Sequence, residues 1–300
     1  MALMVALIGE QPLPNLLPVR RYQPDAVLLV YTERTKGVYE RLVAMLKQET
    51  KVYGLETSAY DVVAIVKALD TRLEEQDLVN QTLIYNLTGG TKTMVLAAYQ
   101  VAQRRKASMF YLQSEGKRNR IYYYTWADQQ LQAQANELLP ECVNLKDILD
   151  LHLGIGKWKE NGPSNNEGGR FQAAVAEILR SQGYEIMVGI STMTEQIDID
   201  VAIRFENQFG IIEAKAGDEG RKLHGIKQLS TAAQPQILGT YTKKFYAITV
   251  PASESHKALR DAANIRIISL QNYVGTDTLS PSDAKELITV IDEAFKGKME

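Results

Sequence analysis

Residues 196–216 read QIDIDVAIRFENQFGIIEAKA and hold two strand-like runs, residues 197–205 and 209–214. The polar residues 206–208 separate the runs, and this arrangement predicts a β-hairpin with a short turn. Apolar residues recur through both runs and indicate strands that pack in a core. These apolar residues are Ile197, Ile199, Val201, Ile211 and Ile212.

Charged side chains take fixed positions on this hairpin. Because alternate residues of a strand share a face, Asp198 and Asp200 lie together. By the same rule, Glu213 and Lys215 lie together on the partner strand. Close carboxylates repel, and burying one without a partner costs roughly several kcal/mol, so such a cluster needs a cation. Mg²⁺ or Mn²⁺, bound through carboxylates and waters, meets this need. The alternative is a surface hairpin whose charges lie in water.

Composition places the chain among ordinary globular proteins. It has 300 residues, of which 45% are hydrophobic and 23% are charged, which is enough for about two domains with hydrophobic cores. The net charge of -2 and the pI near 6.0 exclude the strongly basic surface of a protein that coats DNA. Any contact with nucleic acid is therefore expected from a local basic patch.

Cysteine and histidine are sparse in this sequence. The single cysteine, Cys142, excludes intramolecular disulfides and cysteine-based zinc sites, and the three scattered histidines predict no metal cluster. Residues 1–10 are apolar but short and lack a basic start, so they indicate a first strand and not a signal peptide. No apolar run approaches the ~18 residues of a membrane span. These features predict a cytoplasmic protein without a membrane partner.

The first half of the chain alternates strands with helices. Apolar strands separated by helices indicate a mostly parallel sheet with helices on both faces. Ligands of such sheets bind at the carboxyl ends of the strands, so the residues that follow each strand are candidates. Strands are predicted at 3–8, 27–31, 52–55, 82–87 and 109–112, and helices at 37–48, 60–75 and 93–105.

Three polar loops follow these strands: 9–18 (GEQPLPNLLP), 32–37 (TERTKG) and 88–94 (TGGTKTM). In the third loop, paired glycines allow a tight turn, and the amides that open the next helix, together with Lys92, favour an anion. Thr91 stands directly before Lys92, where a Walker-type phosphate loop requires glycine, so an NTPase is disfavoured. The alternative is a simple helix cap.

The segments GEQPLPNLLP and NLTGGTKTM resemble the CARF sensor domains of type III CRISPR systems. The C-terminal hairpin, with Asp200 followed after twelve residues by Glu213-Ala214-Lys215, resembles the PD-(D/E)xK nuclease superfamily. Nearly the whole chain is thus similar to the CRISPR ancillary nucleases that cyclic oligoadenylate activates. The resemblance implies a Rossmann-like α/β CARF domain at residues 1–145, a linker at 146–166 and a restriction-endonuclease-like α/β domain at 167–300.

The resemblance also implies a ligand and an assembly. Two CARF domains are expected to pair about a two-fold axis, as a homodimer, around one cyclic oligoadenylate. Cyclic tetra-adenylate is the ring size that the family implies. The ligand-binding residues implied are Gln11, Pro12, Asn15, Thr32, Thr35, Thr88, Gly89, Gly90, Thr91, Lys92, Thr93 and Met94.

For the second domain, the resemblance implies metal-dependent cleavage of RNA and/or DNA in antiviral defence. Asp200, Glu213 and the backbone of Ala214 are expected to hold Mn²⁺ or Mg²⁺. Lys215 is expected to assist attack on the phosphodiester, and Gln228, on a following helix, to support the site.

Gln172 departs from the pattern of this nuclease family. It stands where a glutamate is expected to complete the metal site, and an amide supplies no negative charge. Either Glu167 or Glu177 substitutes, or Asp198 takes over, or activity is reduced; Glu177 lies about 140° around the helix from Gln172 and is disfavoured. A sensor with a catalytically degenerate nuclease-like domain is therefore an alternative. Another is a ring nuclease, in which Lys92 and the threonine hydroxyls help the CARF site to cut its own ligand.

Overall fold

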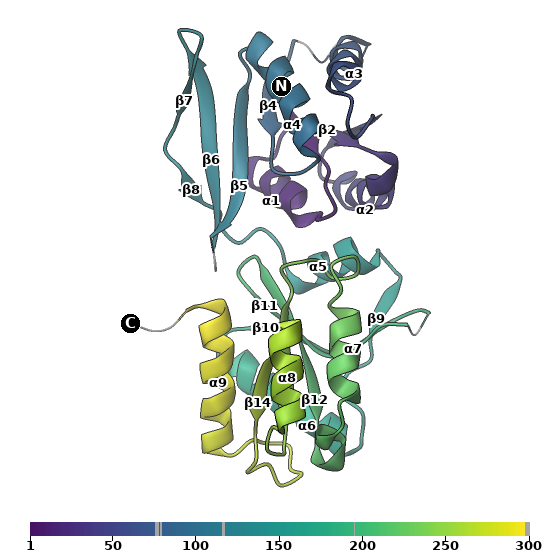
Figure 1. The fold of residues 1–300 in the computed structure, drawn as a ribbon, viewed down its shortest axis with the longest axis vertical. Coiled ribbons are helices and arrows are strands. Elements are labelled where there is room, and N and C mark those ends of the chain that lie inside the picture. The colour runs from purple at the N-terminus through teal and green to yellow at the C-terminus, as the bar shows by residue number, and fades with distance from the viewer. Residues whose placement is uncertain (76–77, 79, 116–117, 195, 298–300) are drawn as a thin grey trace. The chain divides into compact units, whose positions relative to one another are not determined.

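The computed structural model describes residues 1–75, 78, 80–115, 118–194 and 196–297. The chain divides into two compact units, Met1–Cys142 and Val143–Glu300, each built around its own sheet (Figure 1). Both units combine helices with a sheet that contains parallel strands, so the predicted α/β class is confirmed. No helix among the described residues is long and apolar enough to cross a membrane.

The sheet of the first unit has the strand order β3-β2-β1-β4-β5-β6-β7, with β8 beside β6. Neighbours from β3 to β5 run parallel, whereas β6 pairs antiparallel with β5, β7 and β8. Strand β1 lies between β2 and β4, so the chain order reverses there. The strands are β1 (Ala2–Leu7), β2 (Ala26–Tyr31), β3 (Lys51–Glu56), β4 (Thr82–Asn86), β5 (Ser108–Glu115), β6 (Arg118–Ala127), β7 (Gln130–Ala133) and β8 (Glu137–Leu138).

Helices cover both faces of the parallel strands, as predicted. Leu3 and Val5 of β1 pack in one core with α3 and α4. Met4 and Ala6, which point to the other face, are equally buried, and α1 and α2 contact β1 and β2. The helices are α1 (Leu13–Tyr22), α2 (Lys36–Leu46), α3 (Val62–Glu75) and α4 (Lys92–Arg104), with a 3₁₀ turn η1 (Glu33–Thr35) before α2.

Helix α1 corrects the prediction of a loop over residues 9–18. Proline is tolerated in the first turn of a helix, and Pro12 and Pro14 lie at this helix start. Pro18 lies inside the helix and has no N–H to donate to the carbonyl of Pro14. The side-chain Nδ2 of Asn86 donates to that carbonyl instead, at 2.9 Å. A tertiary contact therefore sustains a helix whose prolines suggested a loop.

The second unit holds a sheet with the order β14-β13-β12-β11-β10-β9. The strands β12 to β14 run parallel, and β9 to β12 run antiparallel, so the predicted hairpin is β11–β12. Helices α6 and α9 share a core with one face of this sheet. The elements are α5 (Leu145–Leu153), β9 (Trp158–Glu160), α6 (Glu167–Ser181), β10 (Glu185–Thr192), β11 (Asp198–Phe205), β12 (Gln208–Lys215), η2 (Gly217–Arg221), α7 (His224–Ala232), β13 (Lys243–Ile248), α8 (Glu254–Ala263), β14 (Arg266–Ser269) and α9 (Pro281–Phe295).

The boundary between the units differs from the expected linker at 146–166. The chain divides after Cys142, and α5 and β9 belong to the second unit. Strand β9 pairs antiparallel with β10, and the indole N–H of Trp158 donates to Asp150 Oδ1 at 2.9 Å. The short edge strand lies within a polar, turn-forming sequence, which is why the sequence indicated a linker. Residues 298–300 of the predicted second domain lie outside the described residues.

Candidate functional site

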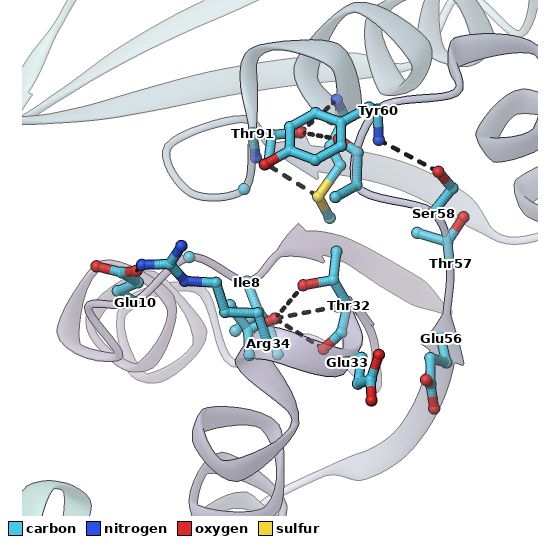
Figure 2. Close-up of a pocket in the computed structure, with 15 residues that line it drawn as sticks. Ile8, Glu10, Thr32, Glu33, Arg34, Glu56, Thr57, Ser58, Tyr60 and Thr91 are labelled. Atoms are coloured by element: carbon cyan, nitrogen blue, oxygen red, sulfur yellow. Dashed lines mark hydrogen bonds and ion pairs between the residues drawn. The ribbon is translucent and has the colours of Figure 1, made fainter. Parts of the chain in front are cut away.

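A pocket of about 620 Å³ lies at the carboxyl ends of the parallel strands in the first unit (Figure 2). The segments that follow β1, β2 and β3 form it together with the start of α4. This is the sheet edge at which the chain order reverses, where such folds bind ligands. The lining residues are Ile8, Gly9, Glu10, Thr32, Glu33, Arg34, Thr35, Glu56, Thr57, Ser58, Ala59, Tyr60, Gly90, Thr91 and Met94.

The paired glycines bring the start of α4 against the end of β1. A Cβ on Gly89 would lie 2.2 Å from the carbonyl oxygen of Leu7, which no side chain allows. Gly90 has a φ of +76°, in the left-handed region that glycine adopts readily. Gly90 therefore forms part of the pocket lining, and the N-terminal amides of α4 begin there.

Two threonine hydroxyls fasten α4 to the loop after β3. Thr91 Oγ1 and Thr93 Oγ1 each donate to the carbonyl of Ala59, at 2.6 Å in both cases. The two hydroxyl oxygens lie 2.8 Å apart, and Thr91 Oγ1 also accepts from the backbone N–H of Met94 at 3.2 Å. These hydroxyls cap the helix and position a neighbouring loop. The helix-cap alternative is thus correct for part of this motif, although Thr91 also lines the pocket.

The opposite side of the pocket carries a charged pair. Thr32 and Thr35 form a reciprocal capping arrangement, in which Thr32 N–H donates to Thr35 Oγ1 at 3.0 Å. Between them in sequence, Arg34 forms an ion pair with Glu10 from the loop after β1. The side chains of Arg34 and Glu10 are 81% and 55% exposed. Figure 2 shows this pair across the pocket from Tyr60 and Thr91.

The predicted ligand residues divide into two groups. Those that line the pocket are Thr32, Thr35, Gly90, Thr91 and Met94. The others do not line it: Gln11, Pro12, Asn15, Thr88, Gly89, Lys92 and Thr93.

Two members of the second group have structural contacts beneath the pocket. Thr88 Oγ1 donates to Asn86 Oδ1 at 2.6 Å and accepts from the backbone of Leu112 at 2.9 Å. Asn15 is fully buried, and its Oδ1 lies 3.5 Å from Asn86 Nδ2. Lys92, by contrast, is exposed at the first position of α4. Asn15 and Thr88 therefore hold the sheet edge together.

Sequence reasoning missed the loop after β3, which supplies the lining residues Thr57, Ser58, Ala59 and Tyr60, next to Glu56 at the end of the strand. A signal for this loop was present in the sequence. A short strand was predicted at residues 52–55, and the residues after a parallel strand lie at the same edge as those after its neighbours. The loop carries no glycine pair or proline, and it was therefore overlooked.

In the second unit, the hairpin brings Asp200, Glu213 and Lys215 together. Lys215 Nζ lies 3.0 Å from Asp200 Oδ2 and 2.7 Å from Glu213 Oε1. Asp200 and Glu213 are only 6% and 4% exposed, so the surface-hairpin alternative is wrong for these two residues. The lysine ammonium bridges two buried carboxylates.

Burial sets the electrostatics of this cluster. Burial and the Asp200 carboxylate raise the pKa of Glu213 to about 8. Burial also raises the pKa of Asp200, although Lys215 counteracts this rise. Burial by itself lowers the pKa of Lys215, but the two carboxylates outweigh it and raise that pKa above its ordinary value. The cluster therefore retains a proton near neutral pH that a bound cation would displace.

The two strands of the hairpin separate at this cluster. Their pairing extends from Phe205 and Gln208 to Val201 and Ile212 and stops there. Beyond it, the backbone N–H of Ala214 donates to Asp200 Oδ2 at 2.8 Å instead of to the neighbouring strand. The N–H and C=O of one strand residue point to the same side, so the Ala214 carbonyl is directed to this opening as well. Two carboxylates and a backbone carbonyl are a donor set that fits Mg²⁺ or Mn²⁺.

The predicted metal site needs a third carboxylate beside Asp200 and Glu213. No group of three or more His, Cys, Asp or Glu side chains in the described part of the chain is arranged to hold a metal ion. Gln172 is half-buried on α6, which packs against the sheet face opposite to Asp200 and Glu213. Glu167 and Glu177 are exposed on the same helix. 

Asp198 is the remaining candidate for that third carboxylate. It lies two residues from Asp200 on β11, is exposed, and its charge raises the pKa of both Asp200 and Glu213. Asp198 is therefore the additional carboxylate whose charge acts on Asp200 and Glu213.

Helix α7 covers the face of the sheet that carries the cluster. A Cβ on Gly225 of α7 would lie 2.7 Å from the ring of Tyr246, which is paired in register with Glu213. Gln228 is half-buried on this helix, and its supporting role stays a prediction. Burial and the charge of Glu213 raise the pKa of Tyr246 to about 12, and its hydroxyl donates to the carbonyl of Lys222.

Comparison with known proteins identifies the first unit. Residues 3–147 match the family model of the Card1 CARF domain. No curated protein matches the chain.

Solved structures extend the similarity to the whole chain. Can2 from Sulfobacillus thermosulfidooxidans, solved in complex with cyclic tetra-adenylate, is 18% identical with a TM-score of 0.73, over 96% of this chain and 99% of that chain. Protein VC1899 from Vibrio cholerae is 13% identical with a TM-score of 0.71, over 99% and 98%. A type III CRISPR defence DNA nuclease activated by cyclic oligoadenylate is 17% identical with a TM-score of 0.62, over 95% of this chain and 51% of that one. At these identities the likeness shows a shared fold. The first unit therefore belongs to the Card1 type of CARF domain.

Proposed function

We propose that the CARF unit binds a cyclic oligoadenylate, with cyclic tetra-adenylate as the first candidate. The observation that carries this proposal is the pocket of about 620 Å³ at the carboxyl ends of β1, β2 and β3. Can2, which shares the fold, was solved in complex with cyclic tetra-adenylate, and this supports the same ligand class here.

The lining of the pocket suits a ligand made of phosphates, riboses and adenines. The N-terminal amides of α4 and the guanidinium of Arg34 are donors for phosphate oxygens. The carboxylates of Glu33 and Glu56 are acceptors for ribose hydroxyls and adenine amino groups. An inorganic anion would use only the first set, so the pocket favours a nucleotide over phosphate alone.

A homodimer would let one ring contact two such pockets. A cyclic tetra-adenylate repeats its chemical groups around the ring, and two copies of the chain about a two-fold axis present each loop twice. The proposed sensor is therefore a homodimer of CARF units with one shared ligand.

The second unit is proposed to hydrolyse phosphodiester bonds in RNA and/or DNA. Asp200, Glu213 and the Ala214 carbonyl would hold Mn²⁺ or Mg²⁺, which supplies Lewis-acid chemistry when bound. Lys215 is positioned to stabilise negative charge on the attacked phosphate. Gln228 is proposed to support the site from α7.

Ligand binding in the first unit would regulate this chemistry. A ligand shifts a conformational equilibrium only as far as it binds one arrangement better than the other. We infer that cyclic oligoadenylate binds the cleavage-competent arrangement of the dimer more tightly than the resting one. The output would be cleavage that depends on both the ligand and the metal.

One observation favours a second candidate function, a sensor without catalysis. Gln172 replaces an expected carboxylate, and the two acidic residues nearest to it along α6 are exposed. If Asp198 does not complete the metal site, the second unit would act by recognition alone.

A cleavage assay tests both candidates with one set of samples. The full chain is incubated with and without Mn²⁺ and with and without cyclic tetra-adenylate, in the presence of single-stranded RNA, single-stranded DNA or supercoiled plasmid. We expect cleavage only when metal and ligand are both present. The variant Glu213→Ala should lose at least about a hundredfold of this activity, because it removes a metal ligand.

Matched variants make the result specific. Glu177→Ala removes an exposed carboxylate of α6 and should cleave like the wild type. Ligand-dependent cleavage that survived Glu213→Ala would refute the assigned site. Tight binding of cyclic tetra-adenylate without cleavage, and no gain from Gln172→Glu, would favour the sensor without catalysis.

A further inference from the structure

Tyr60 is both an aromatic residue and a strongly exposed one at the pocket. Tyr60 is 78% exposed, and it is the one aromatic residue among the described residues that line the pocket. An exposed aromatic residue alone means little, because much of any protein surface is apolar. Tyr60, however, is exposed at a pocket that also holds phosphate donors, so its ring is available to a ligand bound there.

The backbone on both sides of Tyr60 is held in place. Before it, the Ala59 carbonyl accepts from Thr91 Oγ1 and Thr93 Oγ1 at 2.6 Å each. Ser58 Oγ accepts from the backbone N–H groups of Tyr60 and Asp61, both at 3.2 Å. The chain then enters α3, whose start is capped because Asp61 Oδ1 accepts from the N–H of Ala64 at 3.0 Å. A rigid support therefore presents an exposed ring.

Figure 2 shows where this ring lies. Tyr60 and Thr91 occupy one side of the pocket, and Arg34 with Glu10 occupies the other. Phosphate donors and a flat apolar ring are thus presented to the same space. A nucleotide carries both matching parts, a phosphate and a base with two π-faces.

We propose that Tyr60 is a stacking platform for an adenine of the bound ligand. This inference rests on the proposed function, because it assumes that the CARF pocket takes a cyclic oligoadenylate. Stacking needs the ring and not the hydroxyl, since the contact is made by the face of the aromatic system. Thr93 is then a positioning residue that acts on the ligand through the Tyr60 loop, whereas Thr91 supports this loop and also lines the pocket.

Calorimetric titration of the full chain with cyclic tetra-adenylate tests this assignment. Tyr60→Phe keeps the ring, and its Kd should stay within about twofold of the wild type. Tyr60→Ala should bind roughly 5- to 150-fold more weakly, which is the range for one base stacked on an aromatic side chain. The matched control is Tyr111→Ala, which removes an exposed tyrosine of β5 outside the pocket lining and should leave Kd unchanged.

A second measurement reports on stacking itself. A cyclic tetranucleotide that carries one 2-aminopurine in place of adenine loses fluorescence when the base stacks. Binding to the wild type and to Tyr60→Phe should quench it, and saturated Tyr60→Ala should quench it less. Thr93→Val should weaken binding in the same direction as Tyr60→Ala, whereas Thr93→Ser, which keeps the hydroxyl, should restore it.

Several results would overturn the assignment. Equal affinity of Tyr60→Ala and the wild type would show that the ring contributes nothing. Equal losses in Tyr60→Phe and Tyr60→Ala would assign the effect to the hydroxyl. A change of oligomeric state in Tyr60→Ala, seen by light scattering, would place Tyr60 in a subunit contact. If the wild type itself fails to bind cyclic tetra-adenylate, the proposed function fails, which is a result distinct from all three.

Discussion

The two candidate sites hold their polar groups in opposite ways. In the CARF pocket, hydroxyls of Thr91 and Thr93 bond to a backbone carbonyl, and the ion pair of Arg34 with Glu10 lies largely in water. In the second unit, the carboxylates of Asp200 and Glu213 are buried and share one lysine. One site is neutral inside and charged only at its rim, whereas the other has its charges inside.

This difference fits the two proposed roles, ligand binding in the CARF pocket and catalysis in the second unit. A neutral hydrogen bond has a small net free energy, and an exposed ion pair contributes roughly 0 to 1 kcal/mol. A ligand can therefore replace either interaction with its own at a small cost in free energy. Buried like charges cost much more, and they raise the pKa of Glu213 to about 8. A site of the second kind is suited to a cation, and a site of the first kind to a reversible ligand.

The largest expected effect follows from removing the Lys215 ammonium that lies between the two buried carboxylates. Lys215→Met leaves two buried carboxylates without a positive partner and should lower the free energy of unfolding by about 3 to 5 kcal/mol at pH 8. The loss should shrink toward about pH 5, because both carboxyl groups then bind protons and no longer repel. Urea unfolding at several pH values measures it.

The control for this variant lies on the neighbouring helix. Lys227→Met removes an exposed lysine of α7 and should change the unfolding free energy by less than about 0.5 kcal/mol. A Lys215→Met penalty that does not depend on pH would mean that lost packing, and not charge, explains the effect.

The next test introduces charge into a buried neutral network beneath the CARF pocket. Asn86→Asp keeps the acceptor for Thr88 but loses the donor to the Pro14 carbonyl, at a fully buried position. We expect about 2 to 3 kcal/mol of destabilisation at neutral pH, because a buried carbonyl loses its partner and a carboxylate faces it. Thermal melting compares it with Asn136→Asp, at an exposed residue.

Binding of Mg²⁺ gives a test that is tied to pH. The pKa of Glu213 lies above its ordinary value, so the folded protein holds a proton that the unfolded chain releases, and stability without metal falls as the pH rises toward about 8. Metal must displace this proton, so its affinity should rise about tenfold per pH unit between roughly pH 6 and 8. The rise in melting temperature that Mg²⁺ causes should therefore be larger at pH 8 than at pH 6, and Glu213→Gln should abolish the difference.

The smallest expected effect concerns the exposed ion pair at the pocket rim. Glu10→Gln frees Arg34 and removes a negative charge, so cyclic tetra-adenylate should bind about two- to fivefold more tightly. Arg34→Ala should weaken binding by about five- to tenfold. The control Asp218→Asn disrupts an exposed pair with Arg221 in the second unit and should leave this affinity unchanged. Tighter binding by Arg34→Ala would contradict the role of Arg34 as a phosphate donor.

Much of the fold followed from local patterns. Apolar alternation identified the hairpin, and its two-residue period placed Asp200 apart from the core-facing Val201 and placed Glu213 with Lys215. The TGG segment was located at a strand end because strand and helix patterns flank it. Such features depend on neighbours in sequence, so the sequence is sufficient to find them.

Other features depended on partners far along the chain. The α1 helix was missed because Asn86 satisfies the carbonyl that Pro18 leaves without a donor. The hydrogen bonds of Thr91 and Thr93 could not be predicted, because their acceptor is the distant carbonyl of Ala59.

The sequence by itself determined much of the strand and helix pattern, the shared face of Glu213 and Lys215, and the placement of the TGG segment after a parallel strand. The tertiary structure alone decided how deeply Asp200 and Glu213 are buried, which loops meet at the CARF pocket, and that Tyr60 is exposed there. The physical reason is that periodicity is fixed by the backbone within a few residues, whereas burial, pKa and hydrogen-bond partners are set by atoms that only folding brings together.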